Sequence, residues 1–163
     1  MKKLLIFLAG VIFGGLIVAS IIYTTYWPMD GEIDTFPVKV FFGNSTFNQN
    51  IEDCRLVYPV EHRATKNVTT AHAAITELLY GPLKGEKREG YFTSINPGVK
   101  INSLSIENGI AKVDFDETLN RGVAGSCRVM AIRSQIEQTL KQFPEVKEVI
   151  ISVNGRTEDI LQP

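Results

Sequence analysis

The feature that most constrains this chain is a run of 19 mostly apolar residues, 4–22, near its amino terminus. A helix of that length spans roughly 28 Å, close to the ~30 Å hydrocarbon core of a bilayer. Lys2 and Lys3 precede the run, and the positive-inside rule then places the N-terminus in the cytoplasm. The sequence therefore predicts a single-pass helix in the cytoplasmic membrane, with the remainder of the chain outside it.

Two other export signals compete with an uncleaved anchor. A cleaved signal peptide needs a shorter apolar region and a small-residue cleavage site, and Val-Ala-Ser at 18–20 runs straight into further apolar residues. A lipoprotein signal needs a cysteine directly after the apolar run, whereas the first cysteine is Cys54. Tyr23, Tyr26 and Trp27 follow the run, where an aromatic belt meets the outer interface. Length and the missing cleavage signal favour the anchor.

Gly10 and Gly14 form a G-x-x-x-G pair inside the apolar run. Small residues at this spacing allow two membrane helices to approach closely. Glycine is also common in membrane helices that do not associate. The pair is therefore a candidate helix-packing site, and both interpretations stay open.

The length and charge of the chain limit its function class. A chain of 163 residues with a net charge of −1 and a pI near 6.1 fits one domain and an appendage. No basic stripe supports nucleic-acid binding. The first 29 residues contain two lysines and no acid, so residues 30–163 carry a net charge of −3. We expect a cytoplasmic stub and signal anchor at 1–27, a linker at 28–36, a folded domain at 37–157 and a tail at 158–163.

Hydrophobic periodicity predicts the elements of this domain. Thr69 or Thr70 is expected to cap the first helix and Ser126 the second, and Asn108-Gly109 is a strong hairpin signal. We expect strands at 38–42, 55–60, 99–107, 110–115 and 146–153, helices at 70–80 and 126–143, and a loop at 83–98. The spacing of the second helix predicts an inner face of Val129, Ile132, Ile136, Leu140 and Phe143, with Arg133, Gln135, Glu137 and Lys141 outward. This ββαββαβ order predicts an α+β fold with one mixed sheet and both helices on one of its faces.

The two cysteines, Cys54 and Cys127, allow three interpretations. An exported domain folds in an oxidising compartment, where two cysteines 73 positions apart can form a disulfide. Alternatively, Cys127 lies at a predicted helix N-terminus, where a thiolate nucleophile is stabilised, with His62 or His72 as a base. The third interpretation is a pair of buried free thiols. The even count and the predicted export favour the disulfide.

Other polar motifs give little support to catalysis or to a metal. Asp114 and Asp116 alternate with apolar residues and are expected on an outward, solvated face. The glycine-containing loop 122–126 lacks the lysine of a phosphate-binding loop. His62 and His72 are ten residues apart without a third ligand pattern. We therefore predict no catalytic residue, no cofactor and no metal.

Several stretches of this sequence resemble a known family. They are VKVFF at 38–42, YPVEHR at 58–63, ELLYGP at 77–82, NPG at 96–98, NGIAKVDF at 108–115 and QTLKQFPEV at 138–146. Together they are similar to the GerMN domain, the sporulation and spore-germination module, from about residue 38 to 155. The resemblance implies a non-enzymatic, membrane-tethered, extracytoplasmic domain of the bacterial envelope, with a fold like the ring-building motif of secretion-system ring proteins.

Three functions remain open at this stage. The first is an interaction or scaffold domain, with a protein partner or further copies of itself in the envelope and a role in envelope assembly, sporulation or germination. The second is a binding protein for a cell-wall glycan or small ligand, with a cleft near the 83–98 loop. The third is an envelope enzyme that uses Cys127, or Asp114 and Asp116. An aromatic-lined pocket would favour the second function, and a reduced Cys127 beside a histidine would favour the third.

Overall fold

The computed structural model of this protein describes residues 34–49, 53–66 and 68–162. The expected membrane helix at 4–22, with Gly10 and Gly14, lies outside this part of the chain. Within it, no helix is long and apolar enough to span a membrane. The elements follow in the order β1 (Thr35–Asn44), β2 (Tyr58–Thr65), α2 (Thr70–Tyr80), α3 (Lys84–Arg88), β3 (Tyr91–Phe92), β4 (Ile101–Glu107), β5 (Ile110–Phe115), the 3₁₀ turn η1 (Glu117–Leu119), α4 (Ser126–Lys141) and β6 (Glu148–Val153).

Local signals account for the ends of most elements. The Thr69 hydroxyl accepts a hydrogen bond from the His72 backbone N–H and caps α2, which ends at Gly81 with a φ of 77°. Asn108 and Gly109 join β4 to β5 with φ values of 52° and 84°, as the hairpin signal predicts. The cap of α4 differs from the expectation: Gly125 occupies the cap position, and no side chain caps this helix.

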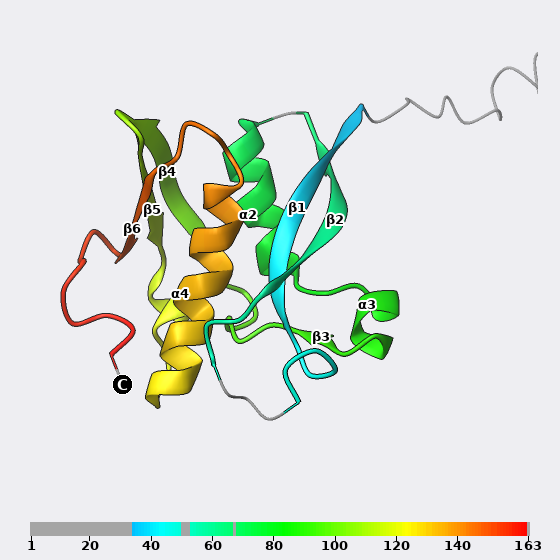
Figure 1. Ribbon diagram of the computed structural model, residues 1–163. Helices are drawn as coiled ribbons and strands as arrows, with labels where there is room; N and C mark the ends of the chain where they lie inside the picture. Colours follow the sequence, from blue (N-terminus) through cyan, green and yellow to red (C-terminus); the bar gives the residue numbers. More distant parts are fainter. Residues whose placement is uncertain (1–33, 50–52, 67, 163) are drawn as a thin grey trace, which may run out of the picture. The chain divides into compact units, whose positions relative to one another are not determined.

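The strands form two sheets, so the expected single mixed sheet is wrong. One sheet has the order β2-β1-β3 and the other the order β4-β5-β6. β1 pairs antiparallel with β2 and β3, β5 pairs antiparallel with β4, and β5 pairs parallel with β6. The two sheets lie on opposite sides of the helix pair α2 and α4 (Figure 1). The helices are therefore the middle layer of three and do not cover a single face.

The middle position of the helices is visible in the core. Ile75 and Leu78 of α2 belong to the larger core, which includes Val113 of β5 and Phe42 of β1. A second, smaller cluster joins α2 to the β1–β2 hairpin and consists of Val38, Ala64, Ala73 and Ala74. The small alanine side chains on this side of α2 allow the helix to lie close to the β1–β2 pair. Both helices thus bury side chains on two opposite sides.

The other differences from the predicted elements are local. β2 begins at Tyr58, three residues later than expected, and the 83–98 segment contains α3 and β3. The expected tail at 158–163 includes Ile160 and Leu161, which are buried in the larger core. Asn120 Oδ1 accepts a hydrogen bond of 2.9 Å from the Leu161 backbone N–H. Ile160 and Leu161 therefore fix the C-terminal segment to the domain.

Candidate functional site

Large apolar side chains gather on the surface near β3. Tyr80, Leu83 and Phe92 expose 78%, 57% and 46% of their surface, and Phe47 and Leu56 are also exposed. Tyr80 and Phe92 line one hollow, and Phe92 and Leu56 line another. Phe47 contacts Tyr91 of the first lining, and Leu83 directly follows Pro82 of the same lining. We call the surface formed by Phe47, Leu56, Tyr80, Leu83 and Phe92 the apolar end.

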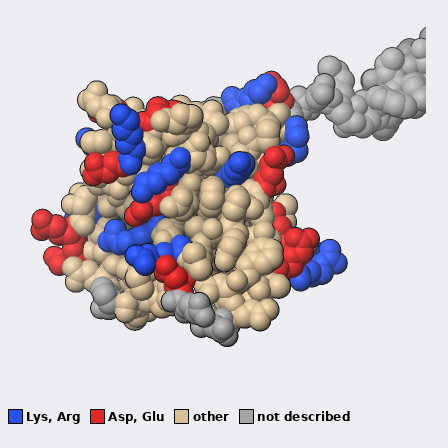
Figure 2. Space-filling view, viewed as in Figure 1, with Lys and Arg blue, Asp and Glu red and all other residues tan. Residues whose placement is uncertain are grey.

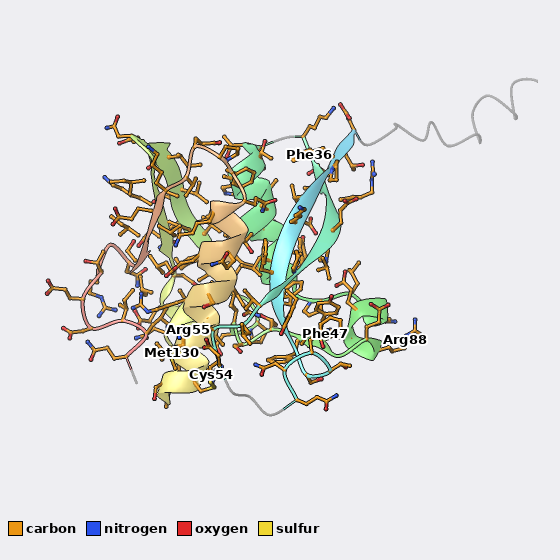
Figure 3. All side chains as sticks on the ribbon, in the orientation of Figure 1. Phe36, Phe47, Cys54, Arg55, Arg88 and Met130 are labelled. Carbon is orange, nitrogen blue, oxygen red and sulfur yellow. A yellow bond between two sulfur atoms is a disulfide. The ribbon has the colours of Figure 1, made fainter. Side chains whose placement is uncertain are left out.

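The apolar end lies where β1 finishes. β1 starts at Thr35 and runs for 10 residues to Asn44, beside β3 and α3 (Figure 1). A strand of that length extends about 33 Å. Phe36 and Phe47 accordingly appear at opposite ends of the hairpin in Figure 3. Figure 2 shows one face of the domain. In the lower half of this view, a surface of uncharged residues separates the charged side chains on the left from those on the right. The chain thus enters the domain at one end and presents its exposed apolar residues near the other.

Phe92 is held on the surface by direct contact with a glycine. Phe92 pairs with Gly43 between β3 and β1. A Cβ atom added to Gly43 would lie 2.5 Å from Phe92 Cζ, a distance that real Cβ contacts do not show. The ring therefore covers the Gly43 backbone, and any larger residue at position 43 would displace it.

Gln135 of α4 fixes the segment that follows β3. Gln135 Oε1 accepts hydrogen bonds from Thr93 Oγ1 at 3.2 Å and from the Ser94 backbone N–H at 3.1 Å, and Nε2 donates to the Phe92 carbonyl oxygen at 3.3 Å. Gln135 is fully buried, whereas the sequence predicts it on the outward face of this helix. The prediction is wrong because α4 has a sheet on both sides.

Asn44, at the end of β1, orders the adjoining turn. Asn44 Oδ1 accepts hydrogen bonds from the backbone N–H groups of Thr46 and Phe47, at 2.8 and 3.1 Å. Its Nδ2 donates to the Glu89 carbonyl oxygen at 3.2 Å, just beyond α3. Asn44 is buried and makes these three hydrogen bonds, so it places both Phe47 and the end of α3.

One hollow beside Phe92 has a volume of about 470 Å³, and we call it the disulfide hollow. It lies between the first turns of α4 and the end of β1. The residues that line it are Gly43, Asn44, Ser45, Asn48, Gln49, Cys54, Leu56, Val57, Phe92, Ser94, Ala124, Cys127, Arg128 and Ala131. Its described walls are apolar, amide or hydroxyl groups, except for the Arg128 guanidinium.

The disulfide hollow contains the Cys54–Cys127 bond. The two cysteines form a disulfide with a Cα–Cα distance of 5.2 Å, and no cysteine in the described part of the chain is free. Figure 3 labels Cys54 beside the lower end of α4. The expected pairing is therefore present in the structure. In this bonded state Cys127 has no thiol with which to act as a nucleophile.

A second hollow lies on the other side of Phe92, with a volume of about 470 Å³, and we call it the Tyr91 hollow. Its lining residues are Leu79, Tyr80, Gly81, Pro82, Lys87, Tyr91, Phe92, Thr93, Ile95 and Pro97. The Phe47 ring contacts Tyr91 edge-on, with ring centroids 6.3 Å apart. The hollow has three aromatic side chains in its walls, Tyr80, Tyr91 and Phe92, and lies at the 83–98 segment, near which a cleft is expected from the sequence.

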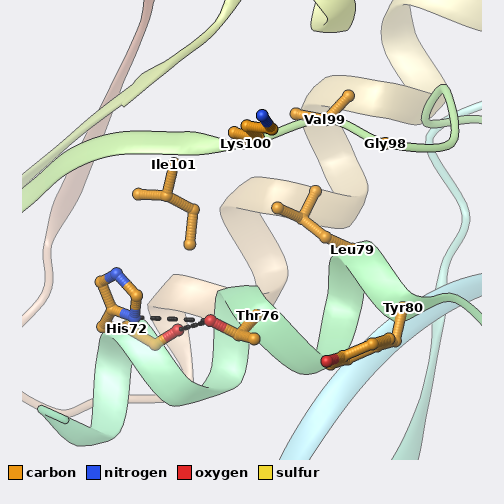
Figure 4. A pocket seen from close by; sticks show the side chains of 8 residues that line it. All are labelled: His72, Thr76, Leu79, Tyr80, Gly98, Val99, Lys100 and Ile101. Carbon is orange, nitrogen blue, oxygen red and sulfur yellow. Dashed lines mark hydrogen bonds between the residues drawn. The ribbon is translucent and has the colours of Figure 1, made fainter.

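A third hollow, of about 400 Å³, lies between α2 and the start of β4, and we call it the His72 hollow (Figure 4). Leu79, Val99 and Ile101 form its apolar walls. Thr76 Oγ1 donates to the His72 carbonyl oxygen at 2.8 Å and lies 3.4 Å from His72 Nδ1. These polar contacts lie within α2, so they do not form a set of groups converging on a ligand.

His62 is a buried histidine whose surroundings the sequence does not predict. It is 3% exposed, on the inner face of β2. Its Nδ1 lies 3.1 Å from Glu77 Oε2, and its Nε2 lies 3.2 Å from both carboxylate oxygens of Glu86. The histidine therefore connects β2 to both α2 and α3. Within the described part of the chain, no group of three or more His, Cys, Asp or Glu residues is arranged to hold a metal ion.

The two candidate carboxylates, Asp114 and Asp116, act as local hydrogen-bond acceptors. Partial burial acts to raise the pKa of Asp114, but hydrogen bonds from Ser152 Oγ, the Gly155 N–H and Asn102 Nδ2 outweigh it and lower the pKa. The Asp116 pKa is lowered in the same way: burial is outweighed by hydrogen bonds from the Lys100 N–H and from Thr118. Neither is the freely solvated carboxylate that the sequence predicts.

Little in the sequence identifies the apolar end in advance. Tyr91 and Phe92 occur in a segment expected to be a loop, and the exposure of Tyr80 follows from its position at the end of α2. Five large apolar residues from position 79 to position 92 are nevertheless more than a solvated loop requires. This excess is the signal that sequence reasoning could have used.

Comparison with known proteins gives a consistent family. Residues 39–159 match the Germane family, described as "Sporulation and spore germination". The chain is 30% identical over 130 residues to the spore germination protein GerM of Bacillus subtilis, a match that covers 76% of this chain and 33% of that protein. The chain thus spans about a third of the length of this curated relative.

Solved structures of GerM from Bacillus subtilis have the same fold. The structure of its tandem GerMN domains matches with a TM-score of 0.59 and 28% identity, over 79% of this chain and 43% of that one. Its first GerMN domain matches with a TM-score of 0.52 and 18% identity, over 75% of this chain and 85% of that one. The expected resemblance is therefore confirmed, and this chain belongs to the Germane (GerMN) family of sporulation and spore germination domains.

Proposed function

We propose that this protein is a non-enzymatic interaction domain of the bacterial cell envelope, anchored in the cytoplasmic membrane and folded on its outer side. The observation that carries this proposal is the apolar end, where exposed Tyr80 and Phe92 line the Tyr91 hollow and exposed Leu56 and Phe92 line the disulfide hollow. Exposed apolar side chains that lie together on one surface, rather than singly, are typical of protein contact sites.

Two further observations support this proposal. The apolar run at residues 4–22, behind Lys2 and Lys3, favours an anchored N-terminus. The apolar end lies about one strand length from the point where the chain enters the domain at Asp34. The apolar end thus belongs to the folded domain that this proposal places outside the membrane.

Site-specific photo-crosslinking in the native membrane tests this function. A photoreactive residue placed at Leu83 should form a covalent adduct with a protein partner or a second copy, since Leu83 is exposed at the apolar end. The same residue placed at Glu61, exposed on the outer face of β2, serves as the matched control. Equal labelling at both positions, or labelling at neither, would contradict the proposed function.

The Tyr91 hollow favours binding of a cell-wall glycan or small ligand as a second candidate function. Tyr80, Tyr91 and Phe92 line it, and the aromatic faces of such side chains can stack against the apolar faces of sugars. Titration of the full-length protein with soluble peptidoglycan fragments, followed by the fluorescence of the tyrosines, tests this candidate. A response that Tyr91→Ala abolishes would support it, whereas an unchanged signal would exclude it for these fragments.

A further inference from the structure

The charged side chains that line the two hollows beside Phe92 differ in sign from the net charge of the domain. Residues 30–163 carry a net charge of −3. The described residues that line the disulfide hollow and the Tyr91 hollow nevertheless include no Asp or Glu. Each hollow instead has one cationic side chain in its wall, Arg128 in the first and Lys87 in the second. An approaching ligand therefore meets positive charge on both sides of Phe92.

Arg128 is held in position by neutral partners. Its Nη2 donates to Asn96 Oδ1 at 2.7 Å, its Nη1 to the Gly122 carbonyl oxygen at 3.2 Å and its Nε to the Ser94 carbonyl oxygen at 3.4 Å. Within the described residues, no carboxylate lies within ion-pair distance of the guanidinium. A guanidinium has five N–H donors, so two remain beyond these three bonds. Its orientation is thus fixed while part of its hydrogen-bonding capacity is unused.

Phe92 separates the two cations with an apolar surface. The ring lines both hollows and is fixed against Gly43, so it loses little conformational freedom on binding. Leu56 extends the apolar surface on the Arg128 side, and Tyr80 extends it on the Lys87 side. A ligand that extends across Phe92 from one hollow to the other therefore meets a positive charge, then an apolar surface, then a second positive charge.

We propose that the apolar end binds an acidic segment of a partner protein, with a large apolar side chain packed on Phe92 and carboxylates at Arg128 and Lys87. This inference rests on the proposed function and names the class of partner. A carboxylate fits the fork of a guanidinium, and an apolar side chain removes the exposed Phe92 ring from water. An uncharged glycan would use the aromatic walls but would leave both cations unmatched, whereas peptidoglycan fragments carry carboxylates and are therefore tested below as competitors.

Fluorescence anisotropy with defined peptides tests the proposal on the full-length protein in lipid nanodiscs. The probe is a labelled peptide in which one Phe is flanked on each side by three Glu residues. Two further peptides replace the Glu residues with Lys, or the Phe with Ala. The Glu–Phe peptide should bind most tightly, and its affinity should fall as NaCl rises from ~0.05 M to ~0.5 M, because salt screens exposed charges.

Charge variants locate the binding surface. Lys87→Glu and Arg128→Gln should each weaken binding of the Glu–Phe peptide by about fivefold, the range of a partly exposed ion pair. Arg88→Glu is the matched control, because Arg88 lies on the same helix, is absent from both linings and points away from the domain (Figure 3). Arg128→Lys keeps the charge without the fork and should bind between the parent and Arg128→Gln. If Arg128→Gln fails to fold, Lys87→Glu alone decides the outcome.

The outcomes separate this inference from the proposed function. Equal binding of the Glu and Lys peptides, or equal loss in Lys87→Glu and Arg88→Glu, would overturn the acidic-segment proposal. If the Leu83 crosslink to a protein persists in the membrane despite that result, the interaction function stands with a different partner class. If a soluble peptidoglycan fragment competes with the Glu–Phe peptide but charge variants have no effect, the glycan candidate replaces it.

Discussion

At the scale of single residues, His62 shows how a polar side chain can be essential to packing in a buried position. Both ring nitrogens of His62 face carboxylates, Glu77 on α2 and Glu86 on α3. Glu86 also accepts a hydrogen bond of 2.7 Å from the Leu83 backbone N–H at the start of α3. The short helix α3, which adjoins the apolar end, is thus linked to β2 through one imidazole.

Replacement of this imidazole by an apolar group should be costly. His62→Leu removes the partner of Glu77 and of Glu86, and we expect it to lower the free energy of unfolding by about 2 kcal/mol. Glu61→Gln, at the neighbouring exposed position of β2, should change it by less than about 0.5 kcal/mol. Urea unfolding of both variants measures the difference. Equal free energies of unfolding for His62→Leu and Glu61→Gln would show that the His62 hydrogen bonds make no net contribution to stability.

Asp114 gives a prediction for acid stability. Burial acts to raise its pKa, but the hydrogen bonds from Ser152, Gly155 and Asn102 outweigh it, so the pKa in the fold is lowered. The ionised carboxylate therefore stabilises the fold above its unfolded pKa of about 3.9, and this contribution is lost as the pH falls through the lowered folded pKa. Asp114→Asn should be about 1 kcal/mol less stable than the parent at neutral pH, with a smaller difference below pH ~4.

Unfolding curves collected across that pH range test the sign of this effect. Glu107→Gln, which changes an exposed carboxylate at the end of β4, is the control and should follow the parent curve. A gap between parent and Asp114→Asn that stays constant down to pH ~2 would mean that the carboxylate charge does not contribute.

At the scale of secondary structure, α4 closes a sheet edge with side chains. Gln135, Thr139 and Gln142 recur at helical spacing along one side of the helix. Thr139 Oγ1 accepts a hydrogen bond from the Phe41 backbone N–H, and Gln142 bonds to both the N–H and the carbonyl oxygen of Lys39. These bonds satisfy the edge of β1 that β2 leaves unpaired, and they block it from pairing with another chain.

A matched pair of substitutions on α4 tests the role of the buried Gln135 amide, which bonds to the end of β3 and the residues after it. Gln135→Leu leaves the Ser94 N–H and the Phe92 carbonyl without partners in a buried site, so we expect a loss of about 2 kcal/mol in the free energy of unfolding. Gln138→Leu makes the same change at an exposed position of the same helix and should be nearly neutral. Similar stability of the two variants would contradict the role assigned to the buried amide.

The apolar patterns of the sequence predict more of this fold than its polar patterns do. Val129, Ile132 and Ile136 are predicted as the inner face of the second helix, and all three are buried. Gln135 is predicted outward because periodicity detects one apolar face and assigns polar residues to solvent. The pattern does not predict the two-sheet arrangement. In that arrangement, polar side chains of this helix meet the edge of β1, which is far away in the sequence.

The sequence predicts even less of the candidate site than of the fold. Cys54 and Cys127 could be paired from their count and the predicted export, and the structure contains that bond. The hollows beside it arise from the placement of Phe92 over Gly43, a contact across 49 positions that no local motif encodes. Long-range packing of this kind has no signature in a single sequence.

The disulfide gives an element-scale prediction for the native state. Closure of a loop of 73 residues can stabilise a fold by about 4 kcal/mol in the chain-entropy model. Reduction, or the double variant Cys54→Ser/Cys127→Ser, should therefore lower the melting temperature markedly. Alkylation of protein from the native envelope without reductant should leave both cysteines unmodified. Modification of both would mean that the bond is absent in the cell.

At the scale of the whole molecule, the outer face of the β4-β5-β6 sheet bears on assembly. Lys112 and Ser105 on this face are exposed and polar, as are Lys147 and Glu148 at its edge. A polar surface of this kind suits modest, reversible contacts and not an obligate interface. Assembly through such contacts depends on how many copies are held near one another.

A membrane anchor at residues 4–22 would supply that proximity. Confinement of many copies to one membrane raises their effective concentration, toward the millimolar range when linkers are short. The Gly10 and Gly14 pair could add a contact between helices. We therefore expect the anchored protein to assemble in its membrane, and residues 30–163 alone to remain monomeric at micromolar concentration.

Crosslinking in the native membrane, compared with size-exclusion chromatography of the anchor-free fragment, measures this dependence. The full-length protein should yield homo-oligomers or a fixed complex with a partner, and Gly10→Leu/Gly14→Leu should reduce the homo-oligomers if the helices contribute. A circular dichroism spectrum of the fragment must show its helices and strands, so that a monomer is not mistaken for an unfolded chain. A tight oligomer of the soluble fragment would contradict the role of the anchor in assembly. A full-length protein that crosslinks to nothing in its own membrane would remove the interaction function itself.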